Sequence, residues 1–561
     1  MASIPRLRFA FRPRLWASLG TYHRDDLVAD VGAGITVALV ALPLAMAFGI
    51  ASGVRPDQGI ATAIVGGLIV SLLGGSRVQI AGPAGAFVGL LYAIADKYGV
   101  ANLLIATMMA GVLLFAMGAF RLGTLVRFVP VSIVIGFTTG IAIIIALSQV
   151  RDFLGLAVGK MPSNFFSQVA VLWDNLHSTN LTALAIGLAC LLVIVVWPTP
   201  QSARPGNWRF VTAKLPSTVV VLTLSGFAVW LLNLHVETIG TRFGSLPAGL
   251  PSPQLPHFDW TTAQNLLAPA IAIALLGAIE SLLCARVADG LIGDRHDPNQ
   301  ELMAQGAANF AAPLFGGIAV TGTIARTMTN VRSGARSPVA GLVHSVTLFL
   351  VILALAPLAS YIPLASLAAV LLWVAFNMVG WRELRQLPRF SIFYRAILLS
   401  TLALTVVFDL TVAVEVGLVM STLFYIYRIS SLTRVDPIDL GDRATLPGGS
   451  KLGAWQLFGS FFFGSVTKLE GLLDPARPLP DVVILEMHKV INIDTTGLDA
   501  LQALHAALLR RGGRLILAAL NEQPLSLLRR SGMLDDLGPQ NITASLETAI
   551  REAGSRASVE G

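Results

Sequence analysis

Long apolar stretches recur along this chain and constrain its fold more than any other feature. The first covers residues 28–50. A helix rises about 1.5 Å per residue, so a stretch of this length spans the ~30 Å hydrocarbon core of a bilayer. The chain is 55% hydrophobic and only 13% charged, whereas soluble domains carry about 25% charged residues. We therefore predict an α-helical polytopic membrane protein.

Fourteen apolar stretches are predicted to lie in the membrane as helices. Several are shorter than the ~20 residues that a straight crossing needs, so we expect some of them to be broken or paired. The predicted spans cover residues 28–50, 58–74, 82–97, 100–120, 125–149, 180–198, 213–235, 264–285, 299–315, 322–335, 339–360, 362–380, 391–408 and 411–428.

Basic residues are distributed unevenly between the segments that join these spans. If the N-terminus lies inside, the inner segments hold many basic residues and the outer segments hold only Arg55, Lys97, Arg151, Lys160 and Arg242. This is the positive-inside pattern, so the net charge of +7 reflects topology and not nucleic-acid binding. Because no small-residue cleavage site follows a short apolar core, residues 28–50 are predicted to be a span and not a signal peptide. We predict a bacterial inner (plasma) membrane protein with both termini in the cytoplasm.

The sequence changes in character near residue 430. Residues 1–27 are predicted to be a cytoplasmic N-terminal segment, 28–430 the transmembrane domain, and 431–450 a polar linker rich in Asp, Pro and Gly. Beyond the linker we predict a strand pair at 454–467, a buried strand at 482–487, a helix at 495–511, a strand at 515–520, and helices that start near Pro524 and Thr543. This alternation predicts a small α/β domain over 451–561.

Two segments that lie far apart in the membrane part have the same pattern. Leu73-Gly74-Gly75 leads into residues 82–85, and Phe315-Gly316-Gly317 leads into residues 322–326. In each, a span ends in Gly-Gly, a polar break follows, and a short helix of small residues begins. Discontinuous helices at matching positions in two halves indicate the binding site of a transporter.

Two half-helices that begin inside the membrane would direct free N–H groups and positive dipole ends at one place. Arg326 is predicted to lie in the first turn of the second half-helix and adds a full positive charge. An intramembrane arginine costs at least ~2.5 kcal/mol, so it needs a reason. We predict an anion site here. A structural alternative is that the guanidinium binds loose carbonyl groups at the helix break, and both roles can coexist.

Glu280 lies near the middle of the eighth predicted span. A carboxyl group at that depth is paired, protonated or bound to a cation. It is therefore a candidate proton carrier for coupled transport. It could instead hold sodium together with Ser281 and backbone carbonyls, or form a fixed ion pair with Arg326.

The sequence contains few motifs that would indicate another class of function. The chain has no Gly-Lys-Ser/Thr phosphate loop, no His-Glu zinc motif and no nucleophile elbow, so we predict neither an enzyme nor an ATP-driven pump. Its two cysteines, Cys190 and Cys284, lie in apolar stretches and suggest neither a disulfide nor a metal site. No cofactor is predicted.

In the C-terminal domain, residues 493–498 follow a buried strand and open a helix. Asp494 is a candidate N-cap. The Thr496 hydroxyl is a candidate phosphate acceptor, since a helix N-terminus favours added negative charge. Simple capping of the helix is the alternative.

These motifs resemble the SulP family of anion transporters, which includes sulfate permeases, pendrin and prestin. The resemblance rests on residues 30–47, 74–77, 82–83, 315–317 and 330–335, and residues 494–498 resemble the STAS domain that ends these proteins. It implies seven plus seven spans in an inverted repeat, with a core (spans 1–4 and 8–11) that slides against a gate (spans 5–7 and 12–14) in an elevator-type mechanism. It also implies a homodimer.

The family's anion site, transferred by matching motif, is flanked by Phe48 and Glu280. The site itself falls on Pro83, Ala84, Gly85, Gly322, Thr323, Ile324, Ala325 and Arg326. The phosphate acceptor of related STAS proteins is a serine, and Thr496 is the matching position here.

Within the family, residues 277–285 and 152–156 are most similar to a bacterial transporter of four-carbon dicarboxylates. Sodium-coupled bicarbonate members carry Asp at the position of Glu280 and lack the arginine at 326. We therefore predict proton-coupled uptake of succinate or fumarate. The alternatives are a sulfate or bicarbonate transporter on the same scaffold, a sensor centred on the STAS domain with a cytoplasmic protein partner, and a uracil or purine permease. Arg326 and the STAS tail disfavour the last.

Overall fold

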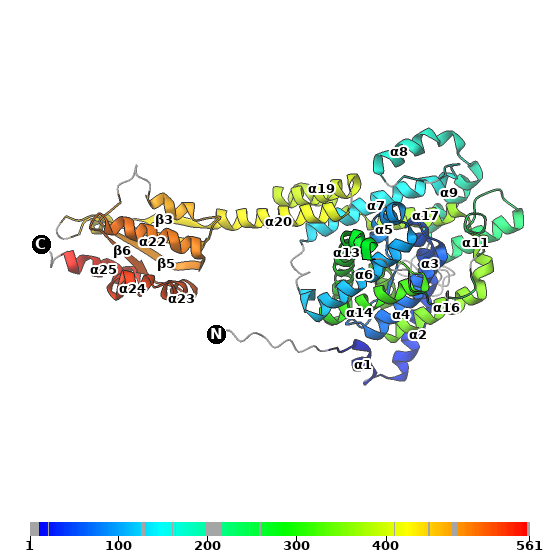
Figure 1. Cartoon of the computed structure of the whole chain (residues 1–561), viewed down its shortest axis with the longest axis horizontal. Helices are drawn as coiled ribbons and strands as arrows, with labels where there is room; N and C mark the ends of the chain where they lie inside the picture. Colours follow the sequence, from blue (N-terminus) through cyan, green and yellow to red (C-terminus); the bar gives the residue numbers. More distant parts are fainter. Residues whose placement is uncertain are drawn as a thin grey trace. The chain divides into compact units, whose positions relative to one another are not determined.

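The chain forms two compact units, Met1–Leu418 and Val419–Gly561, which divide within α20 (Leu410–Leu432). The structure is a computed structural model, and it describes residues 11–20, 22–124, 130–159, 161–162, 164–197, 216–245, 247–256, 260–408, 410–446, 449–473 and 479–557. In these residues the first unit is helical apart from two short strands, and the second unit is α/β (Figure 1).

Helices lie in all fourteen predicted spans, although residues 125–129 of the fifth, 198 of the sixth and 213–215 of the seventh are outside the described part. In the first half these are α2 (Arg24–Ala51), α3–η1–α4 (Pro56–Leu73), η2–α5 (Gly85–Tyr98), α6 (Val100–Ala119), α7 (Val131–Leu154), α9 (Leu181–Val196) and α11 (Ser217–Leu232). In the second half they are α13 (Trp260–Ile292), α14–η5 (Pro298–Phe315), α15 (Ile324–Arg332), α16 (Val339–Ala359), α17 (Leu364–Met378), α19 (Ile392–Val407) and α20. Among the described residues, six helical segments are long and apolar enough to cross a membrane unaided.

Four short α-helices of the first unit were not predicted: α1 (Arg14–Leu19), α8 (Phe165–Asp174), α12 (Ile239–Phe243) and α18 (Trp381–Gln386). None of them contains a long apolar stretch, which is the signal on which the span prediction depends.

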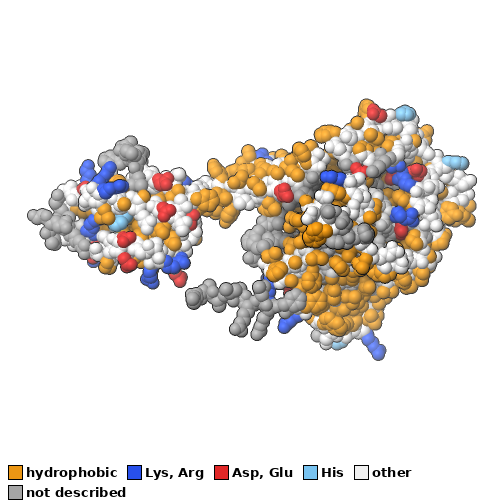
Figure 2. Space-filling view, in the orientation of Figure 1, with side chains coloured by type: hydrophobic (Ala, Val, Ile, Leu, Met, Phe, Trp, Pro, Cys, Tyr) orange, Lys and Arg blue, Asp and Glu red, His pale blue; other side chains and the backbone are white. Residues whose placement is uncertain are grey.

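The surface of the helical unit suits a lipid environment. Leu181 is 77% exposed and Val196 is 72% exposed at opposite ends of α9. Figure 2 shows hydrophobic side chains gathered over much of the visible face of this unit, whereas charged side chains are spread over the second unit. Apolar exposure on this scale is expected where lipid and not water is the solvent.

The two predicted helix breaks meet in space. Strand β1 (Ala81–Gly82) pairs antiparallel with strand β2 (Thr321–Gly322), with Ala81 opposite Gly322 and Gly82 opposite Thr321. Extended backbone at membrane depth must have its polar groups satisfied inside the protein. Each break supplies the hydrogen-bonding partner that the other needs.

Two glutamines make reciprocal contacts between the halves. Gln300 of α14 donates to the carbonyl of Leu73 at 2.6 Å, and Gln58 of α3 donates to the carbonyl of Gly316 at 2.9 Å. Each side chain thus holds the end of the broken span in the opposite half. This exchange is the arrangement expected of an inverted repeat.

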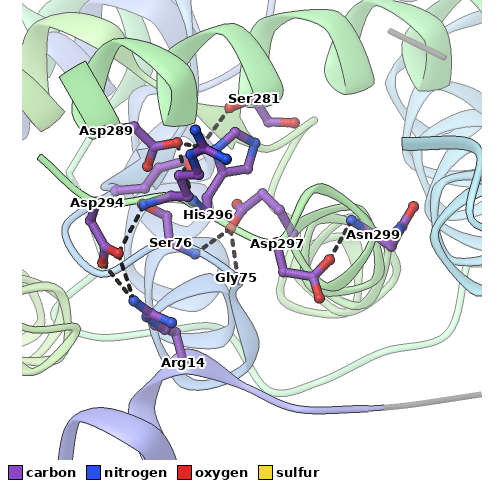
Figure 3. Close-up of polar contacts among 12 residues, drawn as sticks. Arg14, Gly75, Ser76, Ser281, Asp289, Asp294, His296, Asp297 and Asn299 are labelled. Carbon is purple, nitrogen blue, oxygen red and sulfur yellow. Dashed lines mark hydrogen bonds and ion pairs between the residues drawn. The ribbon is translucent and has the colours of Figure 1, made fainter. Parts of the chain in front are cut away.

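The first break is also held by a buried carboxylate and by the N-terminal segment. The fully buried Glu301 accepts the N–H groups of Gly75 at 2.9 Å and Ser76 at 3.2 Å. Figure 3 shows Arg14 directed at Asp294 beside these residues, at an N–O distance of 2.6 Å. Partial burial opposes ionisation of Asp294, but its bonds from the Arg295 N–H and the Arg14 guanidinium prevail and hold its pKa below the usual range.

The second unit contains a five-stranded sheet in the order β3-β4-β5-β6-β7. Its strands are β3 (Arg434–Ile438), β4 (Leu452–Phe461), β5 (Val482–Ile493), β6 (Arg514–Ala518) and β7 (Ile542–Thr543). Only β3 is antiparallel to its neighbour. The predicted strand pair at 454–467 was therefore wrong, because β4 pairs with β3 and β5 and the chain then turns into α21 (Thr467–Glu470). Strand β3 also lies within residues 431–450, which were predicted to be a linker.

Helices cover both faces of this sheet. One core, which includes Leu485 and Leu517, packs under α22 (Thr495–Leu509) and α23 (Glu522–Arg530). The other face, with Ile484 and Ile516, packs under α25 (Leu546–Ala557). Strand residues alternate between the two faces, as their period of two requires.

Candidate anion site

The N-termini of two half-helices lie next to the β1–β2 pair. The first half-helix begins with η2 (Gly85–Phe87) and continues as α5, and the second is α15. Ala84 and Thr323 precede them in extended conformation, and neither helix start has a hydrogen bond from a capping side chain within the described chain. The first N–H groups of each helix are therefore available to a ligand.

Hydrogen bonds from α14 and from the backbone of Ile80 hold this junction in place. Asn309 of α14 binds both backbone groups of Val320, at 2.8 Å to its N–H and 2.7 Å to its carbonyl. The backbone of Ile80 accepts from Thr323 N–H at 2.9 Å and donates to the Thr327 hydroxyl at 3.0 Å. The first break is thus joined directly to the start of the second half-helix by hydrogen bonds.

Arg326 lies at the third position of α15, within its first turn as predicted, and its side chain is only 1% exposed. Its guanidinium lies against the first break, since a methyl group added at Gly82 would be 2.4 Å from Nη1. Among the described residues none accepts a hydrogen bond from Nε, Nη1 or Nη2. In the structural alternative the guanidinium binds loose carbonyl groups at the helix break. No hydrogen bond to such a carbonyl is present among the described residues, so this alternative is not supported.

Phe48 lies at the start of the first half-helix. A methyl group added at Gly85 would be 3.2 Å from Cε1 of Phe48, 3.2 Å from Sδ of Met378 and 3.3 Å from Cδ1 of Ile145. Phe48 comes from α2 of the predicted core, whereas Ile145 and Met378 come from α7 and α17 of the predicted gate. The start of η2 is therefore enclosed by apolar side chains of both parts.

The other predicted site residues differ in exposure. Pro83, Ala84, Gly85, Gly322 and Thr323 are buried. By contrast, Ile324 is partly exposed and Ala325 is exposed, so the first two residues of α15 border accessible space. All eight backbone positions lie within or directly beside the β1–β2 junction.

Glu280 is partly exposed on α13. No ion pair joins it to Arg326 within the described residues, so the fixed-pair hypothesis finds no support in this conformation. Its neighbour Ser281 is fully buried, and its carbonyl accepts from Gln79 at 3.1 Å. Gln79 in turn lies against Gly322, where an added methyl group would be 1.6 Å from Nε2.

His344 of α16 is a polar residue beside the site that the sequence analysis missed. It is fully buried, and neither ring nitrogen has a partner in the described part of the chain. Its Cδ2 would lie 3.7 Å from a methyl group at Gly67, whose other neighbours include the carbonyl of Ala81 in β1. A titratable residue in an apolar stretch is the signal that identified Glu280, and it could have identified His344 as well.

In the second unit, Asp494 caps α22, as predicted, by accepting the Gly497 N–H at 2.9 Å. Thr496 is partly buried at the second helical position, one residue after the exposed Thr495. Because Asp494 performs the capping, the Thr496 hydroxyl is not needed for it. Phosphorylation of Thr496 stays a prediction. Across both units, no group of three or more His, Cys, Asp or Glu among the described residues could hold a metal ion.

Comparison with known proteins gives matches to both units. The sulfate permease family matches residues 27–401, and the STAS domain matches residues 451–549. A putative sulfate transporter of Bacillus subtilis, YvdB, is 40% identical over 521 residues, which cover 93% of this chain and 96% of the relative.

Two solved structures are similar as well. The transmembrane domain of a cyanobacterial bicarbonate transporter, BicA, has a TM-score of 0.62 and 32% identity, and the match covers 70% of this chain and 98% of that one. Murine Slc26a9, an anion transporter in its inward-facing state, has a TM-score of 0.85 over 99% of this chain and 96% of that one; at 18% identity it supports the fold alone. The names of these relatives refer to sulfate, bicarbonate and anions, so they give no support to the predicted likeness to a dicarboxylate transporter.

Proposed function

Because this chain belongs to the sulfate permease family and is a multi-pass anion transporter with a C-terminal STAS domain, we propose that it carries a small oxyanion, sulfate in the first place, on the β1–β2 junction. The anion would lie between the starts of η2 and α15, with Phe48 on its apolar side. The observation that carries this proposal is Arg326, a buried guanidinium without an acceptor among the described residues.

Electrostatics support an anion as the missing partner. An uncompensated buried charge costs several kcal/mol, and a bound oxyanion would compensate the guanidinium while accepting from the uncapped N–H groups of both half-helices. A divalent anion uses this positive field more fully than a monovalent one. The 40% identity to a putative sulfate transporter agrees with this choice.

Bicarbonate is the second candidate, and the likeness to the BicA transmembrane domain favours it. Dicarboxylate uptake, predicted from the sequence, now rests only on charge balance at Arg326. For either candidate we expect elevator-type movement of the core in a homodimer, with both termini in the cytoplasm.

Uptake of labelled sulfate, bicarbonate and succinate into cells that express the chain tests this proposal. We expect sulfate uptake in the parent protein and a loss of about tenfold or more in Arg326→Gln, since each charge-assisted hydrogen bond contributes roughly 1.5–3 kcal/mol. Arg332→Gln is the matched control, because Arg332 is exposed at the other end of α15. Equal uptake by Arg326→Gln and the parent protein would refute the proposed site.

Glu280 is proposed to carry a coupling proton. Glu280→Gln removes the titratable group but keeps the shape of the side chain, so we expect the variant to bind sulfate and to lose the stimulation of uptake by an acidic exterior. Binding to purified protein and uptake as a function of external pH measure the two effects separately. If the pH dependence of uptake is unchanged, Glu280 is not the coupling residue; sodium dependence that disappears in the variant would indicate a cation site instead.

A further inference from the structure

A cavity of about 1,040 Å³ lies in the helical unit. Its walls include the loop after α2, α5 along its whole length, the second half of α7, α12 and part of the first half of α13. Its lining includes Ala86 and Ile144, which directly neighbour Gly85 and Ile145 in the sequence. None of the predicted site residues lines the cavity, but Ala86 of η2 does, so the cavity reaches the start of the first half-helix.

The basic residues predicted on the outer side gather around this cavity. Of those five residues, Lys160 lies outside the described residues. The other four all line the cavity: Arg55, Lys97, Arg151 and Arg242. They come from four separate segments, so their convergence is a result of the tertiary structure and not of local sequence.

Two of these four cations are already partnered. Arg55 pairs with Asp57 at 3.0 Å and donates to the carbonyl of Phe243 at 2.9 Å. Arg242 pairs with Asp152 at 2.9 Å and also with Glu237. The charges of Arg55 and Arg242 are therefore largely compensated by neighbouring carboxylates, and these side chains would attract a solute anion only weakly.

The other two cations are more weakly partnered within the described residues. The exposed Lys97 has only the ring of Tyr98, with Nζ at 5.0 Å from its centroid. The Nε of Arg151 has no hydrogen-bond partner there, and it lies 3.8 Å from the Asp152 carboxylate, to which Arg242 is closer at 2.9 Å. Lys97 ends α5 in the predicted core, and Arg151 lies near the end of α7 in the predicted gate.

We propose that Lys97 and Arg151 form an outer capture site that attracts small divalent oxyanions into this cavity before they reach the β1–β2 junction. The inference rests on the proposed function and adds an entry step to it. Charged walls of low dielectric raise the local concentration of a counter-ion and its rate of arrival. Two cations on opposing elements favour a divalent anion such as sulfate over a monovalent one such as bicarbonate.

The test uses Lys97→Cys in intact cells with labelled sulfate. We expect the apparent KM for sulfate to rise about three- to tenfold with the maximal rate unchanged, as for loss of one charge from a steering field. An external, membrane-impermeant thiosulfonate that adds a trimethylammonium group should restore the KM, and one that adds a sulfonate should raise it further. The other cysteines, Cys190 and Cys284, are buried and should not react.

Three further variants complete the experiment. Lys97→Arg should keep the parent KM, and Arg151→Gln should raise it as Lys97→Cys does. Arg55→Gln combined with Asp57→Asn removes a paired cation of the same cavity without changing its net charge, and should leave the KM unchanged. All effects should be larger for sulfate than for bicarbonate and should shrink at high ionic strength.

The outcomes separate this inference from the proposed function. If the parent protein transports no anion, the proposed function fails. If the parent transports sulfate but Lys97→Cys keeps the parent KM, reacts with neither reagent from outside, or responds equally to both, the capture site is refuted while the transport function stands.

Discussion

At the scale of single residues, the proposed anion site depends most on Arg326. A guanidinium offers five N–H donors, and none of its nitrogens has an acceptor among the described residues although the side chain is 1% exposed. Gly82 is the residue that allows this group to lie against the first break. The absence of a side chain at Gly82 is therefore as much a part of the site as the presence of Arg326.

This contact predicts the effect of a single methyl group. In Gly82→Ala the new Cβ would lie 2.4 Å from Nη1 of Arg326, so the guanidinium must move, and we expect sulfate uptake to fall about tenfold or more, as for loss of one charge-assisted bond. Gly89→Ala on α5 is the control, because its Cβ would meet only Ile144, at 3.6 Å. Similar uptake by the two variants would show that Arg326 can shift without harm.

At the scale of elements, the broken spans are the distinctive feature. Each is interrupted where the opposite half supplies the missing hydrogen bonds, so neither break is stable without the other. Glu301 is the strongest single support, because its carboxylate accepts two backbone N–H groups and the Gln305 amide at 3.0 Å. The proposed site thus depends on side chains that are not among its predicted residues.

Removal of the Glu301 carboxylate should lower the free energy of unfolding, because several buried hydrogen bonds are lost together. Glu301→Leu leaves the N–H groups of Gly75 and Ser76 buried without an acceptor, and each such group costs about 1–3 kcal/mol. We expect a clear fall in the thermal unfolding temperature of the purified protein. Glu301→Gln keeps one acceptor oxygen and should lose less. If both variants unfold at the same temperature as the parent protein, Glu301 does not hold the break.

At the scale of the whole molecule, the chain consists of two units with different solvents. The helical unit exposes apolar side chains, and the second unit buries its own cores on both sheet faces. Strand β3 belongs to the second unit although it precedes the matched STAS region at 451–549. The structural edge of this unit is therefore set by strand pairing.

A pair of fragments tests this boundary. We expect residues 433–557 to fold alone in water and to unfold cooperatively, since both cores and all five strands are included. A fragment that starts at residue 451 lacks β3 and exposes the edge of β4, so it should be less stable and more prone to aggregate. Circular dichroism during thermal unfolding compares the unfolding temperatures of the two fragments. Equal temperatures would show that β3 adds nothing to the domain and acts as a linker.

The sequence alone predicted the features that depend on local composition. Apolar stretches longer than a bilayer is thick can only be spans, and helices lie in all fourteen predicted ranges. The Gly-Gly breaks and Arg326 were identifiable because glycine and buried charge are costly in apolar helices and therefore indicate a function. The family resemblance was confirmed, but its finer likeness to dicarboxylate transporters was not supported by the relatives, whose names refer to sulfate, bicarbonate and anions.

Only the tertiary structure decided which distant residues meet. The β1–β2 pairing, the contact of Arg326 with Gly82, the burial of His344 and the convergence of Lys97 and Arg151 all join segments that are remote in sequence. The strand pair predicted at 454–467 was wrong because the partners of a strand are set by the tertiary structure. Strand β4 pairs with β3 and β5, which lie outside that range. Local patterns determine what each segment can become, whereas packing determines the neighbours that give it a function.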